Sequence, residues 1–179
     1  MEPVPSVFGY GSLVNRRTHA YAPARPARLT GWRRAWAYTR HREGPYLTAV
    51  PAGAGDAIDG LVATIPGGDW AALDRREEGY ARLPTPLPGV MIYAVPDPGV
   101  GTGSAPIALS YIDVVFQGFL DEFGPAGLDR FVATTDGWDT PILNDRAAPC
   151  YPRAQVLTTA QTARVDAILR ALGARVVPG

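Results

Sequence analysis

The sequence predicts an α+β fold, because strand-like segments fill its first half and helical patterns its last third. Turns rich in Pro and Gly separate the apolar, β-prone segments, which are residues 4–9, 31–39, 47–50, 59–65 and 90–95. Farther along, an apolar stripe at helical spacing starts at Tyr111 and ends at Gly124. A second helical pattern covers about residues 159–172, with Gly173 as its C-terminal stop. Strands followed by helices are typical of α+β proteins.

A chain of 179 residues, 46% of them hydrophobic, is long enough to bury one substantial core. We therefore expect a single domain over residues 1–179, with a helical C-terminal third from about residue 107. Residues 96–106 are rich in Pro and Gly, and we interpret them as a flexible connection inside that domain. The sequence does not indicate an oligomeric state.

Charge and cysteine content argue against several function classes. The 17 basic residues, all of them arginine, balance 17 acidic residues, so the sequence favours neither a nucleic-acid partner nor a membrane partner. The single cysteine, Cys150, excludes an intramolecular disulfide and a cysteine zinc cluster, and we interpret it as structural. A transmembrane stretch and a secretory signal are not recognisable, so a cytoplasmic protein is expected. Nucleotide- and metal-binding motifs are also not recognisable, so we expect no cofactor and no metal.

The most informative part of the chain is a predicted helix that Asp69 can cap and that Gly79 ends. At about 100° per residue, Trp70, Leu73 and Glu77 fall within roughly 60° of one another, which places a carboxylate on the apolar face. Burial disfavours the charged form of a carboxyl and raises its pKa, as a general base or acid near neutral pH requires. Glu77 is therefore the candidate catalytic residue.

The next residue, Glu78, points away from this apolar face, and we expect it in solvent. A purely structural alternative exists for Glu77, because buried acids are usually paired. Arg75, Arg76 or a more distant arginine would then neutralise Glu77 at the edge of the core.

A second feature is the glycine-flanked loop where the first predicted strand ends. Gly9 and Gly11 flank Tyr10, and Ser12 and Leu13 follow. Glycine permits backbone geometries closed to other residues and lets a ligand approach the chain closely. Successive N–H groups in such a turn form a concave site for a carboxylate or a polarised carbonyl. The alternative is an ordinary turn after a strand.

The loop at residues 10–13 and the segment at residues 73–77, in this order and at about this separation, resemble the γ-glutamylcyclotransferase superfamily, which includes ChaC-like and AIG2-like proteins. Residues 27–36 are similar to the "Leu-x-Gly-aromatic-Arg-Arg" stretch of the ChaC-like branch. The resemblance covers roughly the first hundred residues. The sequence departs from the ChaC-like pattern at Glu78, where a small residue is more usual, and in its C-terminal third.

The resemblance implies a small mixed β-barrel with flanking helices and a site without metal or cofactor. It implies that backbone amides of the Tyr-Gly-Ser loop hold the substrate, which assigns substrate binding to Tyr10, Gly11, Ser12 and Leu13. It assigns the proton transfers to Glu77. The implied reaction is an intramolecular cyclisation, in which the α-amine of a γ-glutamyl group attacks the γ-carbonyl and releases 5-oxoproline and a free amine.

The substrate class that follows is a small γ-glutamyl compound: a γ-glutamyl dipeptide, glutathione or a γ-glutamyl amine. An alternative is a catalytically inactive relative that binds a small acidic metabolite. A third hypothesis is a hydrolase that uses Ser12 as nucleophile. The sequence around Ser12 lacks the second glycine of Gly-x-Ser-x-Gly, and the two histidines, His19 and His41, are expected in loops or at the surface.

The polar, aromatic and turn-rich stretch at residues 134–146 is either a lid or pocket wall, or a surface loop. Trp138 in this stretch would stack on a substrate or pack against the strands. Arg146 follows an aspartate and requires an opposing partner. Tyr111 and Tyr151 are further candidates for the pocket whose positions the sequence does not fix.

Overall fold

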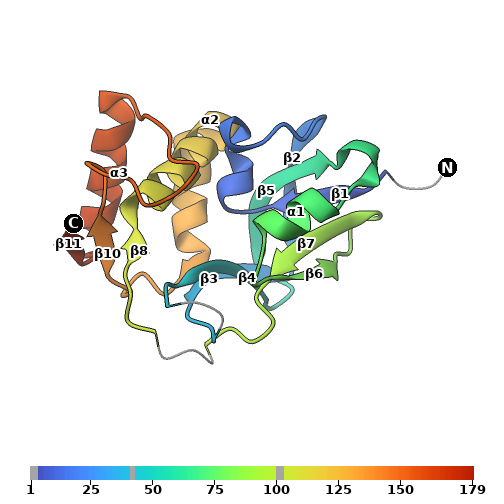
Figure 1. The fold of residues 1–179 in the computed structure, drawn as a ribbon, viewed down its shortest axis with the longest axis horizontal. Helices are drawn as coiled ribbons and strands as arrows, with labels where there is room; N and C mark the ends of the chain where they lie inside the picture. Colours follow the sequence, from blue (N-terminus) through green and yellow to red (C-terminus); the bar gives the residue numbers. More distant parts are fainter. Residues whose placement is uncertain (1–3, 41–42, 100–102) are drawn as a thin grey trace.

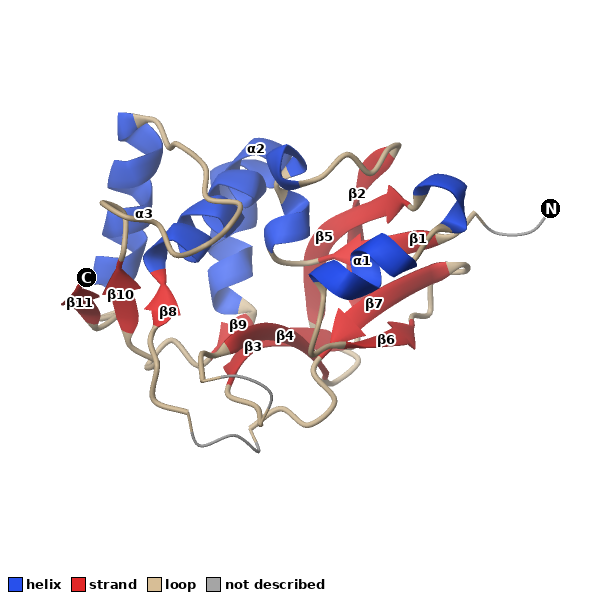
Figure 2. Ribbon diagram, viewed as in Figure 1, coloured by secondary structure: helices blue, strands red, loops and turns tan. Residues whose placement is uncertain are grey.

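The computed structural model describes residues 4–40, 43–99 and 103–179, and its architecture is α+β, as predicted. Figures 1 and 2 show most of the long strands and α1 gathered in one half of the molecule and the helices α2 and α3 in the other. The strands are β1 (Ser6–Gly9), β2 (Ala24–Thr30), β3 (Trp32–Ala37), β4 (Tyr46–Pro51), β5 (Ala57–Thr64), β6 (Ala81–Pro84), β7 (Val90–Ala94), β8 (Ile107–Ala108), β9 (Thr135–Asp136), β10 (Ile142–Asn144) and β11 (Val176–Pro178). The helices are α1 (Ala71–Arg76), α2 (Leu109–Ala133) and α3 (Thr159–Ala171), with short 3-10 turns η1 (Ser12–Val14), η2 (Arg16–Thr18) and η3 (Pro66–Gly68).

The largest sheet has the strand order β2-β5-β1-β7-β6 and is mixed. Strand β1 runs antiparallel to β5, with Ser6 opposite Thr64, and parallel to β7, with Ser6 opposite Val90. All four residues of β1 are buried, as expected of a central strand that is covered on both faces. The loop at residues 10–13 continues directly from β1, so it begins at a fully buried central strand.

Two three-stranded sheets complete the strand pairing, in the orders β4-β3-β9 and β11-β10-β8. Strand β3 contacts β5, and β4 contacts β7, so the first small sheet folds round the same core as the large sheet. The expected architecture was a mixed barrel with flanking helices. In the structure, the hydrogen-bonded strands of the described residues form three separate sheets. Phe8 of β1, Leu47 of β4 and Phe116 of α2 belong to one apolar cluster, which joins the strands to the flanking helix.

The long helix α2 contains a break where the sequence predicts a helix end. Gly124 has φ 66° and ψ −174°, and Pro125 follows it, so the helical hydrogen bonding is interrupted there. The chain then resumes a helix as far as Ala133, which the prediction did not include. The C-terminal helix α3 was predicted closely. Thr158 and Gln161 form a capping box at its start, and Gly173, at φ 64°, follows its end.

The prediction did not include β2 and β6 of the large sheet, nor the short strands β8, β9, β10 and β11. Strand β2 contains Pro26 and two exposed arginines, which weaken its strand pattern. It lies at an edge of the sheet, where a proline can be placed without loss of a hydrogen bond between strands. Strand β6 forms the opposite edge and ends at Pro84. None of the helices in residues 4–40, 43–99 and 103–179 is both long and apolar enough to pass through a lipid bilayer.

Candidate active site

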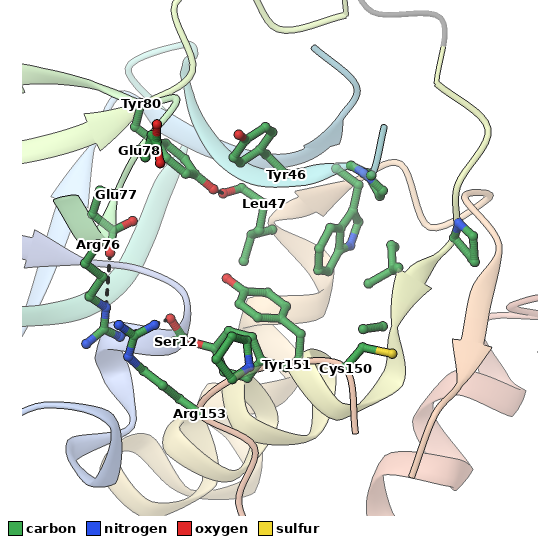
Figure 3. A pocket seen from close by; sticks show the side chains of 18 residues that line it. Ser12, Tyr46, Leu47, Arg76, Glu77, Glu78, Tyr80, Cys150, Tyr151 and Arg153 are labelled. Carbon is green, nitrogen blue, oxygen red and sulfur yellow. Dashed lines mark hydrogen bonds and ion pairs between the residues drawn. The ribbon is translucent and has the colours of Figure 1, made fainter. Parts of the chain in front are cut away.

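A cavity of about 300 Å³ lies where the strand half meets the helical half. Its walls come from the end of α1, from β4, from the segment that leads into α2 and from the C-terminal segment at residues 150–153. Figure 3 shows Ser12, Arg76, Glu77 and Arg153 at one end of this cavity, with Cys150 toward the other. Glu77, which the sequence singled out, therefore lines a cavity large enough to admit a small molecule.

Glu77 occupies the residue directly after α1, which is shorter than predicted. Its backbone N–H still donates to the carbonyl of Leu73 at 2.9 Å, so helical spacing to the buried Leu73 is kept. The Glu77 side chain is 17% exposed, whereas Glu78 is an exposed residue, as expected. At the other end of the helix, Asp69 lies one residue before the N-cap position, which Trp70 occupies. Its carboxylate still accepts a hydrogen bond from the backbone N–H of Ala71 at 3.0 Å.

Burial raises the pKa of the Glu77 carboxyl above its usual value, and the positive charges of Arg76 and Arg153 offset part of this effect. The Nε atom of Arg76 lies 3.3 Å from the carboxylate. The two interpretations of Glu77 are thus compatible, because the carboxyl is both shielded and ion-paired. A carboxyl with a raised pKa that opens into a cavity is suited to accept and return a proton near neutral pH.

The loop at residues 10–13 lies next to Glu77. A small recess of about 30 Å³ is lined by Tyr10, Gly11, Ser12, Leu13 and Glu77 together. Ser12 and Glu77 line the main cavity as well, so the recess is an inner extension of that cavity. The structure therefore brings all five predicted site residues to one place.

Close packing explains the glycine at position 11. Its φ is −125°, so the left-handed region is not involved. A Cβ atom here would come within 2.8 Å of the Tyr111 hydroxyl and 3.2 Å of Leu47. Ser12 then begins η1, whose N-terminus has no side-chain cap. The first backbone N–H groups of a helical turn have no acceptor within that turn, so this end of the loop can donate to a ligand.

A buried arginine fixes the loop from behind. Arg34 donates from Nε to the Tyr10 carbonyl at 2.9 Å, and its other nitrogens donate to the Asp59 carbonyl and to Thr134 Oγ1. The guanidinium also lies 4.5 Å from the ring centre of Phe131. Burial lowers the pKa of Arg34 to about 9, which leaves it charged at neutral pH.

Arg76 links the catalytic candidate to the loop. Its Nη1 donates to the Thr18 carbonyl at 2.8 Å, and its Nη2 lies 3.1 Å from Thr18 Oγ1 and 3.4 Å from Ser12 Oγ. The Arg76 side chain is only 8% exposed. These contacts hold the guanidinium beside Glu77 in one orientation.

The contacts of Ser12 do not support the hydrolase hypothesis. Its hydroxyl contacts Arg76, which cannot act as a base. His19 uses both ring nitrogens elsewhere: Nε2 bonds the Leu13 carbonyl at 2.9 Å, and Nδ1 accepts from the Tyr21 N–H. Burial lowers the pKa of His19, which favours the neutral ring. His41, the other histidine, lies outside the described residues.

The C-terminal segment of the cavity wall is fastened to the start of α2 by Asp145. One carboxylate oxygen accepts from the Ser110 N–H at 2.8 Å, and the other accepts from Ser110 Oγ at 2.6 Å and from the Cys150 N–H at 2.8 Å. Ser110 Oγ in turn accepts from the Tyr151 N–H. This brings the Tyr151 ring into edge contact with Tyr111, at 5.0 Å between ring centres. Cys150 is exposed at the cavity and is not a core residue.

Replacing Asp145 by Asn is expected to lower the free energy of unfolding by about 2 kcal/mol at neutral pH, because an amide keeps only part of this hydrogen bonding. Burial alone would raise the pKa of Asp145, but hydrogen bonds from Ser110 and Cys150 hold it below its usual range. A lowered folded-state pKa contributes stability above the unfolded-state pKa, and that stability is lost as pH falls through the folded value. Urea unfolding should therefore show the difference shrinking below about pH 4. The same difference in unfolding free energy between wild type and Asp145→Asn at neutral pH and below about pH 4 would contradict this role.

Two residues from the stretch at 134–146 do not line the cavity. Trp138 packs edge-on against Trp36, at 5.8 Å between ring centres, and supports the wall from behind. Arg146 forms ion pairs of 2.7 Å with Asp113 and with Asp166. This stretch is therefore structural, apart from the fastening by Asp145.

Sequence reasoning missed several residues of the cavity. Trp36, Tyr46 and Tyr80 line it, and the indole N–H of Trp36 has no hydrogen-bond partner among the described residues. Arg153 also lines it, from a stretch with no periodicity or motif that could have marked it. Within the described parts of the chain, no three His, Cys, Asp or Glu side chains are grouped so that they could hold a metal ion.

A comparison with known protein families identifies the family of this chain. The sequence model for γ-glutamyl cyclotransferase, AIG2-like, matches residues 7–102, which is more than half of the chain. The chain belongs to the AIG2-like γ-glutamyl cyclotransferase family. The resemblance read from the loop and the Glu77 segment is thereby confirmed. The matched residues of the AIG2-like family include Tyr10 to Leu13, Arg76 and Glu77, whereas Arg153 lies outside them.

Solved structures share the fold at low sequence identity. YkqA from Bacillus subtilis superimposes with a TM-score of 0.57 and 17% identity, over 76% of this chain and 57% of YkqA, so this chain spans little more than half of that protein. A structure described as a γ-glutamyl cyclotransferase gives a TM-score of 0.53 and 15% identity, over 92% of this chain and 99% of the other. A human protein described as uncharacterised, loc79017, gives 0.53 and 16%, with the same coverage. No curated protein sequence gave a match.

Proposed function

We propose that this protein is a γ-glutamylcyclotransferase, which converts a γ-glutamyl amide into 5-oxoproline and a free amine. One observation carries the proposal: the shielded Glu77 carboxyl, with its raised pKa, opens into the same recess as the loop at residues 10–13. Membership in the AIG2-like family supports the reaction type. The proposed substrate is a γ-glutamyl dipeptide, glutathione or a γ-glutamyl amine.

Glu77 acts as the proton carrier in this mechanism. Its carboxylate takes a proton from the α-ammonium group of the substrate, and the resulting amine attacks the γ-carbonyl carbon to close a five-membered ring. When the C–N bond to the leaving group breaks, the protonated Glu77 returns the proton to the departing nitrogen. The ring nitrogen gives up its second proton when the lactam forms, and the departing amine takes up a proton to become an ammonium ion. The products are 5-oxoproline and this ammonium ion, so the enzyme ends in its starting state and no cofactor takes part.

The loop at residues 10–13 stabilises the reacting carbonyl in this proposal. Negative charge develops on the carbonyl oxygen when the amine attacks, and donors that are already oriented stabilise it without reorganisation. The N–H group of Leu13 lies at the uncapped start of η1 and provides such a donor, whereas the Ser12 N–H already donates to the Tyr111 oxygen. Arg34 supports this by holding the Tyr10 carbonyl from the opposite side.

The test is to incubate the purified protein with glutathione, several γ-glutamyl amino acids and several γ-glutamyl amines, and to follow both products by mass spectrometry. We expect 5-oxoproline and the free amine in equal amounts from at least one of these compounds. Folded protein that forms no 5-oxoproline from any of them would overturn the proposal. Thermal stabilisation by the same compounds without product would then favour a binding protein for small acidic metabolites.

A further inference from the structure

The cavity lining holds two arginines, Arg76 and Arg153, and two glutamates, and among the described residues an ion pair joins Arg76 to Glu77. Arg76 is ion-paired with Glu77 and fixed by Thr18. Arg153 is a second cation there, since its positive charge also lowers the pKa of Glu77. Figure 3 shows the Arg153 side chain reaching from the C-terminal segment toward Ser12 and Arg76. Two guanidinium groups therefore act on one carboxylate.

Arg153 differs from Arg76 in having no acceptor. Among the residues that the structure describes, none forms a hydrogen bond or an ion pair with its guanidinium, although Arg153 is half-buried and lines the cavity. Its backbone is nevertheless well placed, because Asp145 fastens the preceding Cys150 and Ser110 holds Tyr151. A guanidinium has five N–H donors in a fixed fork that matches the two oxygens of a carboxylate. An anionic ligand would satisfy these donors.

The far end of the cavity is different in character. Figure 3 shows Cys150 at this end, and the cavity lining away from the labelled arginines and glutamates includes the uncharged Trp36, Pro106 and Ile107. A ligand with a charged head and a less polar tail would thus enter in one orientation. A γ-glutamyl compound has such a head, with an ammonium group and a carboxylate on the same carbon atom.

We propose that Arg153, together with Arg76, binds the α-carboxylate of the γ-glutamyl group and so orients the α-amine toward Glu77. This inference rests on the function proposed above. The leaving group then extends toward the apolar end of the cavity. Arg153 lies outside the part of the chain that the family model matches, so this contact adds a substrate-binding residue to the loop and the glutamate.

A binding experiment tests the carboxylate contact without turnover. L-5-oxoproline carries the carboxylate in question, and 2-pyrrolidinone is the same ring without it. We expect 5-oxoproline to stabilise the wild-type protein in thermal-shift titrations and Arg153→Gln to weaken its binding by about 10- to 100-fold, as for loss of a hydrogen bond to a charged group. Binding of 2-pyrrolidinone should not change. Arg75→Gln is the matched control, because Arg75 is exposed and lies outside the cavity lining.

A kinetic experiment separates the two carboxylates that a substrate can carry. γ-Glutamyl-ethylamide has only the α-carboxylate, whereas γ-glutamyl-alanine has a second one on its leaving group. We expect Arg153→Gln to raise KM by a similar factor for both compounds, with a smaller effect on kcat. Arg153→Lys should recover part of the loss, because it keeps the charge but not the planar fork.

Four results would overturn the inference: unchanged binding of 5-oxoproline by Arg153→Gln, no stabilisation of the wild-type protein by 5-oxoproline, normal turnover by Arg153→Gln, or an effect on KM confined to γ-glutamyl-alanine. The last would place the leaving group, not the glutamyl head, at Arg153. Normal turnover by Arg153→Gln would refute this inference and leave the proposed function intact. Binding of 5-oxoproline that depends on Arg153, in a protein that turns over no γ-glutamyl compound, would refute the function alone.

Discussion

Replacing Glu77 by Gln is expected to lower the rate of 5-oxoproline formation by at least about 100-fold, because removal of a general acid or base typically costs 10²- to 10⁴-fold. Glutamine has nearly the same shape but cannot take a proton from the substrate ammonium group. The measurement is initial rates with the best compound of the substrate panel. The matched control is Glu78→Gln, which removes the same charge from the adjacent residue. Glu78 also lines the cavity but is exposed, so this change should alter the rate less than about 3-fold.

The fold of the Glu77 variant can be tested separately. Since burial raises the folded-state pKa of Glu77 above its unfolded value, the wild-type protein loses stability as pH rises through the interval between the two values. Glutamine has no charge to bury. The melting temperature of Glu77→Gln at neutral pH should therefore equal or exceed that of the wild type. Comparable activity in Glu77→Gln, or an unfolded variant, would contradict the role given to this carboxyl.

Replacing Arg34 by Met is expected to lower the free energy of unfolding by about 3–5 kcal/mol, the range found when one partner of a buried charged network is removed. Methionine approximates the length of the side chain, but it leaves the carbonyls of Tyr10 and Asp59 without the donors that Arg34 supplies. Urea unfolding followed by tryptophan fluorescence measures the difference. Activity should fall too, because Arg34 holds the loop that precedes Ser12.

The adjacent Arg33 provides the control for that variant. Its side chain is 27% exposed, and its partners Asp56 and Asp136 are at the surface. Surface ion pairs contribute little, so Arg33→Met should cost no more than about 1 kcal/mol. Equal losses for the two variants would mean that burial of the Arg34 guanidinium does not explain its importance.

The contrast between Glu77 and Glu78 was predictable from the sequence, although the helix that carried the argument is shorter than expected. The reason is the hydrogen bond from the Glu77 N–H to the Leu73 carbonyl, which extends the helical spacing one residue past α1. The predicted direction of the Glu77 side chain was therefore correct, although the predicted end of the helix was not. The class of the fold was predictable for a similar reason, because the apolar patterns of the central strands and of α3 follow directly from burial.

The edge strand β2 and the far wall of the cavity were not predictable in the same way. An edge strand with Pro26 has weak strand propensity, and only its pairing with β5 defines it. Arg153 reaches the cavity because Asp145 bonds Ser110, 35 positions earlier in the chain. A contact between two polar residues so far apart leaves no periodic trace in the sequence. Local patterns therefore identified the loop and the glutamate but not the arginine opposite them.

The fastening of the C-terminal segment by Asp145 has a consequence for how this protein can diversify. The residues proposed to move protons lie before residue 102, whereas Tyr151 and Arg153 belong to a short surface segment anchored at one carboxylate. Mutations around Cys150 in that segment can reshape the side of the cavity toward which the leaving group is proposed to extend, while Arg153 and the buried strands stay unchanged. The proposed proton carrier and the residues that would face the leaving group thus lie in separate stretches of the sequence. An engineer could exchange this segment between relatives to change the proposed substrate selectivity, provided that Asp145, its partner Ser110 and Arg153 are kept.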